Sequence, residues 1–225
     1  MNTFYIVSTP IGNLEDITLR ALSVLKSVDL ILCEDTRVTR HLLENYHIET
    51  KTQSYHAHSK LSKVDYILGL LEEGKNIALV SDAGTPTISD PGILLIQKIK
   101  ETLPEVKIVS IPGASALLCG LTSSALNAHE FTFLGFLPHK KGRETLFAEI
   151  ENSRRTIVFY ESVHRIIKTL ERLSEVLSPE RKISVGRELT KMFQEVLRGT
   201  LSEAIAHFQM KEPRGEFVVL LAGNK

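Results

Sequence analysis

The residues best suited to chemistry follow a strand-like run in the middle of the chain. Asp82, Gly84 and Thr85 belong to the stretch 81–92, which is rich in Gly, Pro and Asp and continues from the apolar run 76–81. Ligands of open α/β sheets bind outside the carboxyl ends of the strands, so this stretch is the first candidate site. A carboxylate there suits ribose hydroxyl groups, or a cationic ligand, better than it suits a phosphate. The alternative is that these residues only shape a turn from strand to helix.

Small and turn-forming residues also follow two other strand-like runs, 3–8 and 106–110. They are Pro10 and Gly12 after the first run, and Ala114, Ser115 and Ala116 after the second. Parallel strands end at one edge of a sheet, so we expect these loops to face one cleft together with Asp82. Small side chains there let a flat ligand approach closely, although a tight strand-to-helix turn would also explain them.

The standard devices for binding phosphate are missing from the sequence. It contains no Gly-x-Gly-x-x-Gly motif and no Gly-x-x-x-x-Gly-Lys-Ser/Thr motif. Both motifs cradle phosphate groups with backbone amides at the start of a helix. Their absence counts against a dinucleotide enzyme or a nucleoside-triphosphate enzyme of the usual kind.

Charged side chains follow the strand-like run 29–33. Asp35 or Thr36 is expected to cap the next helix. Arg37 and Arg40 lie on the first turn of that helix, where they oppose the helix dipole. They are therefore either solvated surface residues or groups that face an anion.

The second half of the chain holds the remaining charged candidates, each after a strand-like run. They are Lys140 and Lys141 after 131–138, Glu161 and Arg165 after 155–160, and Arg187, Glu188 and Lys191 after 182–186. Such clusters are often solvated surface or ion-pair networks. The functional alternative is a catalytic site or a nucleic-acid-binding patch beside an aromatic strand.

Neither the histidines nor the cysteines predict a metal site. His56 and His58 share one face of a short strand-like run, but no third ligand stands at a typical interval. Cys33 and Cys119 lie far apart in apolar runs and form no Cys-x-x-Cys motif. We expect both cysteines to be reduced core residues and the protein to bind no metal.

These residues need an α/β scaffold to position them. Strand-like and helix-like runs alternate over residues 1–113, which predicts a parallel α/β domain. Residues 114–225 predict a mixed α/β domain, in which the runs 182–186 and 195–199 pair antiparallel. Two helix starts are also expected. Ser89 or Asp90 should cap a helix at 92–101 with Pro91 in its first position, and residues 161–165 should open the helix that runs to 177.

The totals fit a globular chain of two domains. Its 225 residues are 43% hydrophobic, and 27 basic residues balance 27 acidic ones, so any RNA contact must come from a local patch. No apolar run approaches the ~20 residues of a membrane span, and we expect a cytosolic protein without membrane partners.

Taken together, the motifs resemble the tetrapyrrole (corrin/porphyrin) methylase superfamily, and within it the methyltransferases that act on ribosomal RNA. The resemblance covers essentially the whole chain and rests on residues 8–18, 33–37, 81–92, 111–116, 135–138, 160–165, 186–191 and 214–218, in the same order. It implies two α/β domains with the class III methyltransferase fold, and S-adenosylmethionine in the cleft between them. It also implies 2′-O-methylation of a cytidine in the decoding centre of 16S ribosomal RNA, within the small subunit, by a homodimer.

The resemblance also assigns residues. The cofactor contacts that it implies are Pro10, Gly12, Asp82, Gly84, Thr85, Ala114, Ser115, Ala116, Tyr160 and Met192. A ribose hydroxyl is a poor nucleophile, so a base should assist it, and the candidates are Lys191, Glu188 and Glu161. The candidates for RNA backbone contacts are Arg37, Lys140, Lys141, Arg165 and Arg187. The rival functions are a tetrapyrrole-precursor methylase and a non-catalytic RNA-binding or assembly module.

Overall fold

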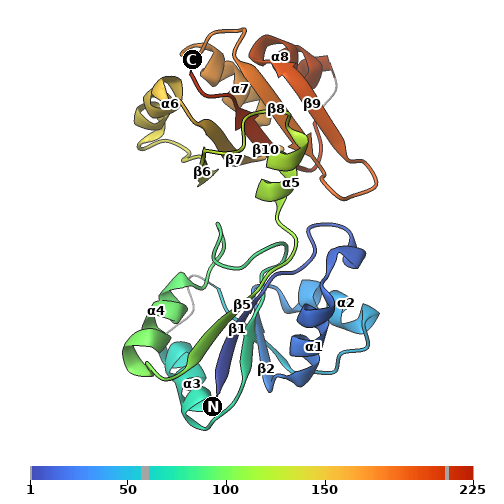
Figure 1. Ribbon diagram of the computed structural model, residues 1–225, viewed down its shortest axis with the longest axis vertical. Helices are drawn as coiled ribbons and strands as arrows, with labels where there is room; N and C mark the ends of the chain where they lie inside the picture. Colours follow the sequence, from blue (N-terminus) through green and yellow to red (C-terminus); the bar gives the residue numbers. More distant parts are fainter. Residues whose placement is uncertain (1, 57–60, 211–212, 225) are drawn as a thin grey trace. The chain divides into compact units, whose positions relative to one another are not determined.

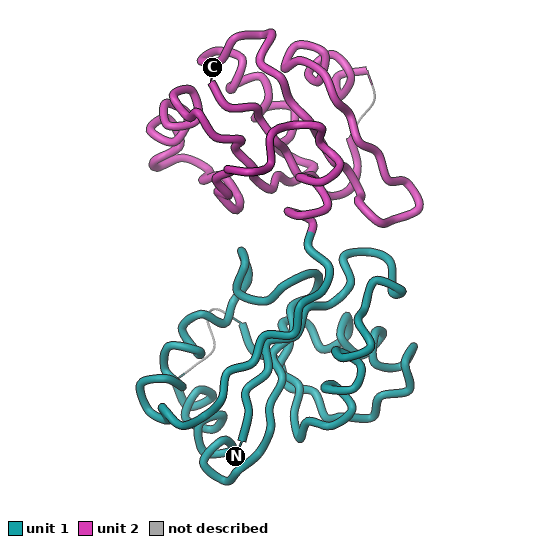
Figure 2. Tube along the Cα trace, in the orientation of Figure 1, with its two compact units in different colours: residues 1–115 teal, residues 116–225 magenta. Residues whose placement is uncertain are grey.

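The chain folds into two compact units. The computed structural model describes residues 2–56, 61–210 and 213–224 (Figure 1). Unit 1 comprises residues 1–115 and unit 2 comprises residues 116–225 (Figure 2). The division falls close to the boundary expected after residue 113, and the assignment of the units as separate domains stays a prediction.

Unit 1 is a parallel sheet covered by helices on both faces. Its strands are β1 (Thr3–Val7), β2 (Leu30–Cys33), β3 (Thr52–Ser54), β4 (Ile77–Leu79) and β5 (Lys107–Ile111). They lie in the order β3-β2-β4-β1-β5, and every pair is parallel. The helices are η1 (Leu14–Asp16), α1 (Leu19–Ser27), α2 (Thr36–Asn45), α3 (Leu61–Glu72) and α4 (Ile93–Thr102).

The side chains of the short apolar strands alternate between two cores in unit 1. One core joins Phe4 and Leu79 to α3 and α4, and the other joins Val7 and Ala78 to α1 and α2. The two helix pairs therefore cover opposite faces of the sheet, as Figure 1 shows. Strands buried on both faces read as continuous apolar runs, which explains why the sequence located them well.

Unit 2 is a mixed sheet with helices on both faces. Its strands are β6 (Phe131–Phe136), β7 (Thr156–Ser162), β8 (Lys182–Arg187), β9 (Glu195–Thr200) and β10 (Glu216–Leu221). They lie in the order β6-β7-β10-β8-β9, with β6 and β7 parallel and the other pairs antiparallel. The helices are α5 (Ala116–Ser123), α6 (Arg143–Asn152), α7 (Ile166–Ser174) and α8 (Leu201–Met210). The predicted α/β class and the antiparallel β8–β9 pair are confirmed.

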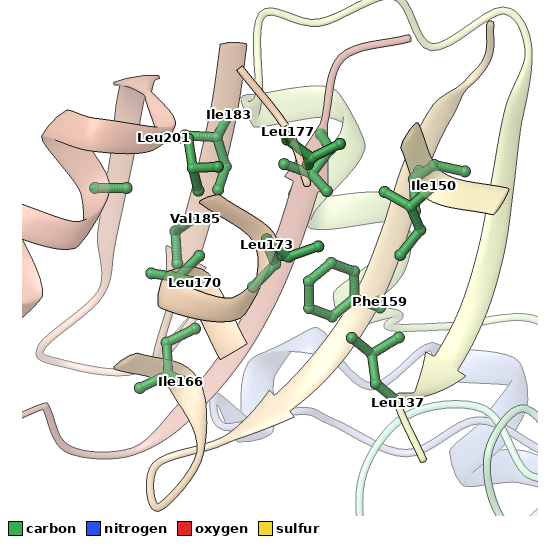
Figure 3. Packing of buried hydrophobic residues seen from close by; sticks show 14 of the residues in the cluster. Leu137, Ile150, Phe159, Ile166, Leu170, Leu173, Leu177, Ile183, Val185 and Leu201 are labelled. Atoms are coloured by element: carbon green, nitrogen blue, oxygen red, sulfur yellow. The ribbon is translucent and has the colours of Figure 1, made fainter. Parts of the chain in front are cut away.

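Most of the core of unit 2 lies on one face of its sheet. Residues of α6, α7 and α8 pack there against Phe159, Val185 and Val219 (Figure 3). Helix α5 contacts the strands β7, β8 and β10 from the opposite face. A Cβ atom on Gly120 of α5 would lie 2.9 Å from Val218 Cγ1, so glycine lets this helix lie close to the sheet.

Two predicted helix starts are wrong. Helix α4 begins after Gly92, which has φ 132° and caps it without a side chain, so neither Ser89 nor Asp90 is the cap. A Cβ atom on Gly92 would lie 2.6 Å from Leu79 Cδ2, so the chain needs glycine there. Helix α7 begins at Ile166 rather than Glu161, because β7 continues through Ser162 and pairs with β10.

Candidate functional site

Three loops meet at the carboxyl edge of the unit 1 sheet. The Thr9 and Gly84 backbones exchange hydrogen bonds of 2.8 and 3.1 Å, which joins the loop after β1 to the loop after β4. The hydroxyl groups of Ser8 and Thr85 lie 2.9 Å apart, and Thr85 Oγ1 donates to the Ala114 carbonyl at 3.4 Å. The residues predicted after three separate strands therefore lie together, as the parallel topology requires.

Glycine lets these loops approach one another closely. Gly84 has φ 82°, and a Cβ atom on it would lie 3.3 Å from Ile11 Cγ2 and 3.8 Å from the Ala114 carbonyl oxygen. A Cβ atom on Gly113 would lie 2.9 Å from Ser8 Cβ. A side chain at either position would push the loops apart and change the shape of the edge.

Asp82 links this set of loops to the loop after β2. Its Oδ1 accepts a hydrogen bond of 3.0 Å from the Asp35 amide. Among the described residues, no group donates a hydrogen bond to Asp82 Oδ2. One carboxylate oxygen is thus used to fix the side chain, and the other is available to a ligand.

The same edge is acidic. Burial raises the pKa of Asp90 to about 6, and Glu34 and Asp82 add to the rise, against a hydrogen bond from Ser81. Burial and the charge of Asp82 also raise the pKa of Glu34, while His56 lowers it. Carboxylates that raise one another's pKa lie close together in a partly desolvated place, which favours a cationic ligand.

Arg37 lies beside this edge but is already paired. It forms an ion pair of 2.6 Å with Asp35 while its own side chain is 87% exposed. The Asp35 side chain also accepts from the Arg37 amide, so Asp35 rather than Thr36 is the cap of α2. Its hydrogen bonds with Arg37 lower the pKa of Asp35 to about 2.

In unit 2 the predicted residues gather at one edge of the sheet. Ser162 at the end of β7 pairs with Glu216 at the start of β10, and Phe217 pairs with Arg187 at the end of β8. The parallel pair β6 and β7 ends at this edge too. This register places at one edge of the sheet the residues Lys140, Lys141, Glu161, Arg165, Arg187, Glu188, Lys191 and Met192, which the sequence spreads over many residues.

Lys191 is held between two carboxylates at this edge. Its Nζ donates to Glu188 Oε1 at 2.9 Å and to Glu216 Oε2 at 2.8 Å. Burial lowers the pKa of Lys191, but the hydrogen bonds with Glu216 and Glu188 outweigh burial and raise it. Burial likewise raises the pKa of Glu188, and its bonds with Lys191 and the Glu216 amide bring it below the usual value. Lys191 is therefore an ammonium and Glu188 a carboxylate at neutral pH.

The other candidates of unit 2 differ in exposure. Glu161 is 1% exposed and bound to Arg165, whereas Met192 is 91% exposed. Lys140 and Lys141 are exposed, and in the described part of the chain neither forms an ion pair. Arg187 is bound to Glu195 at 2.8 Å.

Tyr160 lies in an aromatic group close to the start of α5. Its ring packs edge-on against Phe133 and Phe136, with centroids 5.0 and 5.5 Å away. Its hydroxyl accepts a hydrogen bond of 3.2 Å from the Leu117 amide. The Tyr160 ring is thus held between two phenylalanine rings and the first turn of α5.

Several groups at these edges were not among the catalytic, cofactor or RNA candidates predicted from the sequence. They are Ser8, Thr9, Glu34, Asp90, Arg143, Thr169 and Glu216. Arg143 belongs to the basic run 139–143, but Thr169 carries no signal in the sequence, because only the fold brings it to Arg143 and Glu161. Glu34 and Asp90 follow predicted strands and could have been chosen by the same rule as Asp82.

The described residues hold no cluster of metal ligands, and the cysteines are unpaired thiols. No group of three or more potential metal ligands occurs within residues 2–56, 61–210 and 213–224, and His58 lies outside these ranges. Both cysteines are free thiols; Cys33 is buried as predicted, whereas Cys119, which lies on α5, is only half-buried and so is not a core residue. None of the helices in the described ranges has the length and apolar character needed to cross a membrane.

Comparisons with known proteins agree with this architecture. A family model described as Tetrapyrrole (Corrin/Porphyrin) Methylases matches residues 3–205. The chain is 46% identical over 225 residues to "Ribosomal RNA small subunit methyltransferase I" of Thermotoga maritima, covering 100% of both chains. It is 46% identical over 224 residues to the protein of that name from Synechocystis, covering 99% of this chain and 80% of the relative.

A solved structure shares the fold. Uroporphyrin-III C-methyltransferase from Thermus thermophilus, complexed with S-adenosylhomocysteine, matches with a TM-score of 0.68 at 18% identity. The match covers 97% of this chain and 97% of that one. At this identity the likeness establishes the class III methyltransferase fold and leaves the ligand and the substrate to other arguments.

Proposed function

Because the chain belongs to the tetrapyrrole (corrin/porphyrin) methylase family, and within it to the ribosomal RNA small subunit methyltransferases I, we propose that it methylates ribosomal RNA. The methyl donor is S-adenosylmethionine, and the acceptor is the 2′-hydroxyl of a cytidine in the decoding centre of 16S ribosomal RNA. The observation that carries the proposal is the meeting of three strand-end loops around Asp82 and Gly84.

The residues of this edge fit the proposed cofactor. The cofactor carries ribose hydroxyl groups, a positive sulfonium and no phosphate. Asp82 offers Oδ2 to the hydroxyl groups, and the acidic surroundings of Glu34 and Asp90 favour the positive charge. The absence of phosphate-binding motifs agrees with such a ligand.

The proposed cofactor contacts are those that the resemblance implies, namely Pro10, Gly12, Asp82, Gly84, Thr85, Ala114, Ser115, Ala116, Tyr160 and Met192. Gly84 lets the loops around Asp82 pack closely, because a Cβ atom there would contact Ile11 of the neighbouring loop. Tyr160 is fixed by the Leu117 amide and two phenylalanine rings, so it offers a preorganised surface.

When bound, S-adenosylmethionine supplies a methyl group that its sulfonium has already activated. The protein must therefore hold the ribose oxygen in line with that group, and positioning supplies most of the rate. Lys191, as an ammonium, stabilises the negative charge that develops on the ribose oxygen. Glu188 Oε1 is bound to Lys191, and Oε2 is the atom that receives the ribose proton.

Basic side chains, most of them in unit 2, bind the RNA backbone. Lys140 and Lys141 are exposed and without ion pairs among the described residues, so they are the first contacts. Arg187 and Arg37 would exchange their present carboxylate partners for phosphate. Such contacts place the RNA without reading its sequence. We further propose that the assembled small subunit is the substrate, and that the chain acts as a homodimer.

Labelled methyl transfer tests this function. The protein is incubated with methyl-labelled S-adenosylmethionine and small ribosomal subunits that lack the modification, and the RNA is digested with nuclease and mapped. The proposal predicts label on one cytidine ribose of 16S ribosomal RNA. Label in a porphyrinoid and none in RNA would identify a tetrapyrrole methylase instead. RNA binding with neither transfer nor cofactor-dependent heat stabilisation would identify a non-catalytic module.

A further inference from the structure

The loop that carries Lys140 and Lys141 is anchored at its start in the core of unit 2. Leu137 is 1% exposed and packs in the apolar cluster with Phe159 and Ile166 (Figure 3). The chain then leaves the core at Pro138 and returns to regular structure at Arg143, the first residue of α6. Gly142 has φ 82°, and nothing lies within 4 Å of where its Cβ would be, so the end of the loop is open.

Two arginines hold this anchor through the carbonyl groups of the chain. Arg165 Nη1 donates to the Leu137 carbonyl at 3.0 Å, and Arg143 Nη1 donates to the Pro138 carbonyl at 3.1 Å. The Arg143 guanidinium also lies 5.1 Å from the centre of the Phe147 ring, which restricts it further. The loop is thus fixed from two sides where it leaves the core.

Glu161 and Thr169 hold the two arginines in turn. Glu161 Oε1 forms an ion pair of 2.6 Å with Arg165 Nη2, and Oε2 accepts from Thr169 Oγ1 at 2.7 Å. Thr169 Oγ1 accepts from Arg143 Nη2 at 2.8 Å. The threonine hydroxyl therefore donates to the carboxylate and accepts from the Arg143 guanidinium, so it connects Arg143 to the same carboxylate that Arg165 binds directly.

The carboxylate and the hydroxyl at the centre of this network are buried and hydrogen-bonded, and the two arginines are half-buried. The Glu161 side chain is 0% exposed, Thr169 is 0% exposed, and Oε1 of Glu161 also accepts from the Ser162 amide at 2.8 Å. A buried network of this kind specifies one arrangement, because removing one member leaves the others without partners. With both oxygens occupied inside the protein, Glu161 is out of reach of a ribose hydroxyl.

We propose that Glu161, Thr169, Arg143 and Arg165 are positioning residues that hold loop 138–142 in the conformation that binds RNA phosphates. The inference rests on the proposed RNA substrate, and it removes Glu161 from the candidate bases and Arg165 from the direct RNA contacts. A loop fixed in advance loses less conformational entropy on binding, so the same two lysines bind more tightly.

Thr169→Val tests the network, because it removes the hydroxyl while keeping the shape of the side chain. We expect RNA affinity to fall about fivefold and the log–log salt slope to become about 1 unit shallower, since the lysines no longer meet the phosphates together. Affinity for S-adenosylmethionine should not change. Thr169→Ser keeps the hydroxyl and should restore the RNA affinity and the slope.

Limited proteolysis provides a measurement that does not depend on RNA. Trypsin cleaves after Lys140 and Lys141, and we expect cleavage there to be several times faster in Thr169→Val than in Thr169→Ser, at a temperature where both remain folded. If Thr169→Val does not fold, Arg143→Lys replaces it, since it keeps the charge but loses the second hydrogen bond. Wild-type cleavage rate and salt slope in the folded variant would overturn the inference.

A further variant separates this inference from the proposed function. Lys140→Gln with Lys141→Gln removes the phosphate contacts and leaves the network intact. If this double variant binds RNA as the wild type does, loop 138–142 does not contact RNA, and both the proposed lysine contacts and the positioning role of the network are contradicted. If it binds weakly while Thr169→Val binds normally, only the positioning role is contradicted.

Discussion

The two sheets of this protein end in edges of opposite character. The edge of unit 1 is acidic and is formed by loops whose backbones hydrogen-bond to one another, with Asp82 and Gly84 at the centre. The edge of unit 2 carries exposed lysines on the loop after β6 and ion pairs around Lys191. Acidic residues outnumber basic ones in residues 1–115, and the reverse holds in 116–225, although the whole chain has a net charge of +0.

The difference between the two edges says more about their ligands than the overall charge does. An acidic edge repels RNA and suits a cationic cofactor, whereas exposed lysines attract phosphates. A neutral total conceals this division between the units. Substitutions at one edge at a time should either separate the cofactor role from the RNA role further or show that this division is wrong.

The largest effect is expected for Asp82→Ala. Losing the hydrogen bonds between a carboxylate and two ribose hydroxyl groups should weaken S-adenosylmethionine binding about 1000-fold. Isothermal titration measures the affinity, and circular dichroism checks that the fold is intact. Asp65→Ala on the exposed surface of α3 is the matched control. Wild-type affinity in the Asp82 variant would rule out this carboxylate as a cofactor ligand.

A smaller effect is expected for Lys191→Met at the other edge. Loss of the ammonium beside the reacting oxygen should lower kcat about 100-fold with little change in cofactor affinity. Single-turnover methyl transfer with saturating RNA gives the rate. Lys182 lies at the opposite end of β8, so Lys182→Met serves as the control. An unchanged rate would remove Lys191 from the reaction.

The double change Lys140→Glu with Lys141→Glu should weaken RNA binding about tenfold at moderate salt. Because two phosphate contacts are lost, the log–log salt slope should become shallower by about 1.5 units. Filter binding over a range of salt concentrations measures both quantities. Lys107→Glu makes the same type of change on β5 of unit 1 and should leave the slope unaltered. A slope equal to that of the wild type would contradict the RNA role of this loop.

The smallest effect concerns stability and pH at the acidic edge. Burial raises the pKa of Asp90 to about 6 in the folded protein, so the folded state holds this proton more tightly than the unfolded state does. Its contribution to stability is therefore present at pH 4 and is lost as the pH rises through about 6. Asp90→Asn should raise Tm by a few degrees at pH 7.5, with no gain at pH 4. Equal shifts at both pH values would show that Asp90 titrates normally.

The sequence located the elements better than their junctions. Parallel strands such as β4 are buried on both faces and read as apolar runs, and the rule about strand ends led to Asp82 and Thr85. The start of α4 was missed, because Leu79 of β4 leaves no room for a Cβ atom at position 92, and only the tertiary fold brings Leu79 there.

The same limit applied to the roles of individual side chains. Glu161 and Lys191 look alike as charged residues near strand ends, yet Glu161 is buried and paired with Arg165, whereas Lys191 is shared by two carboxylates. Thr169 could not be singled out at all, since its importance comes from the packing of α7. Burial and partners decide such roles, and both are properties of the fold.

The division of roles is tested most directly by measuring both ligands with one variant of each edge. Affinities for S-adenosylmethionine and for RNA are determined for Asp82→Ala and for Lys140→Glu with Lys141→Glu under identical conditions. We predict that the Asp82 variant loses the cofactor and keeps RNA, and that the lysine variant loses RNA and keeps the cofactor. Loss of both ligands in either folded variant, or the reverse assignment, would contradict the account.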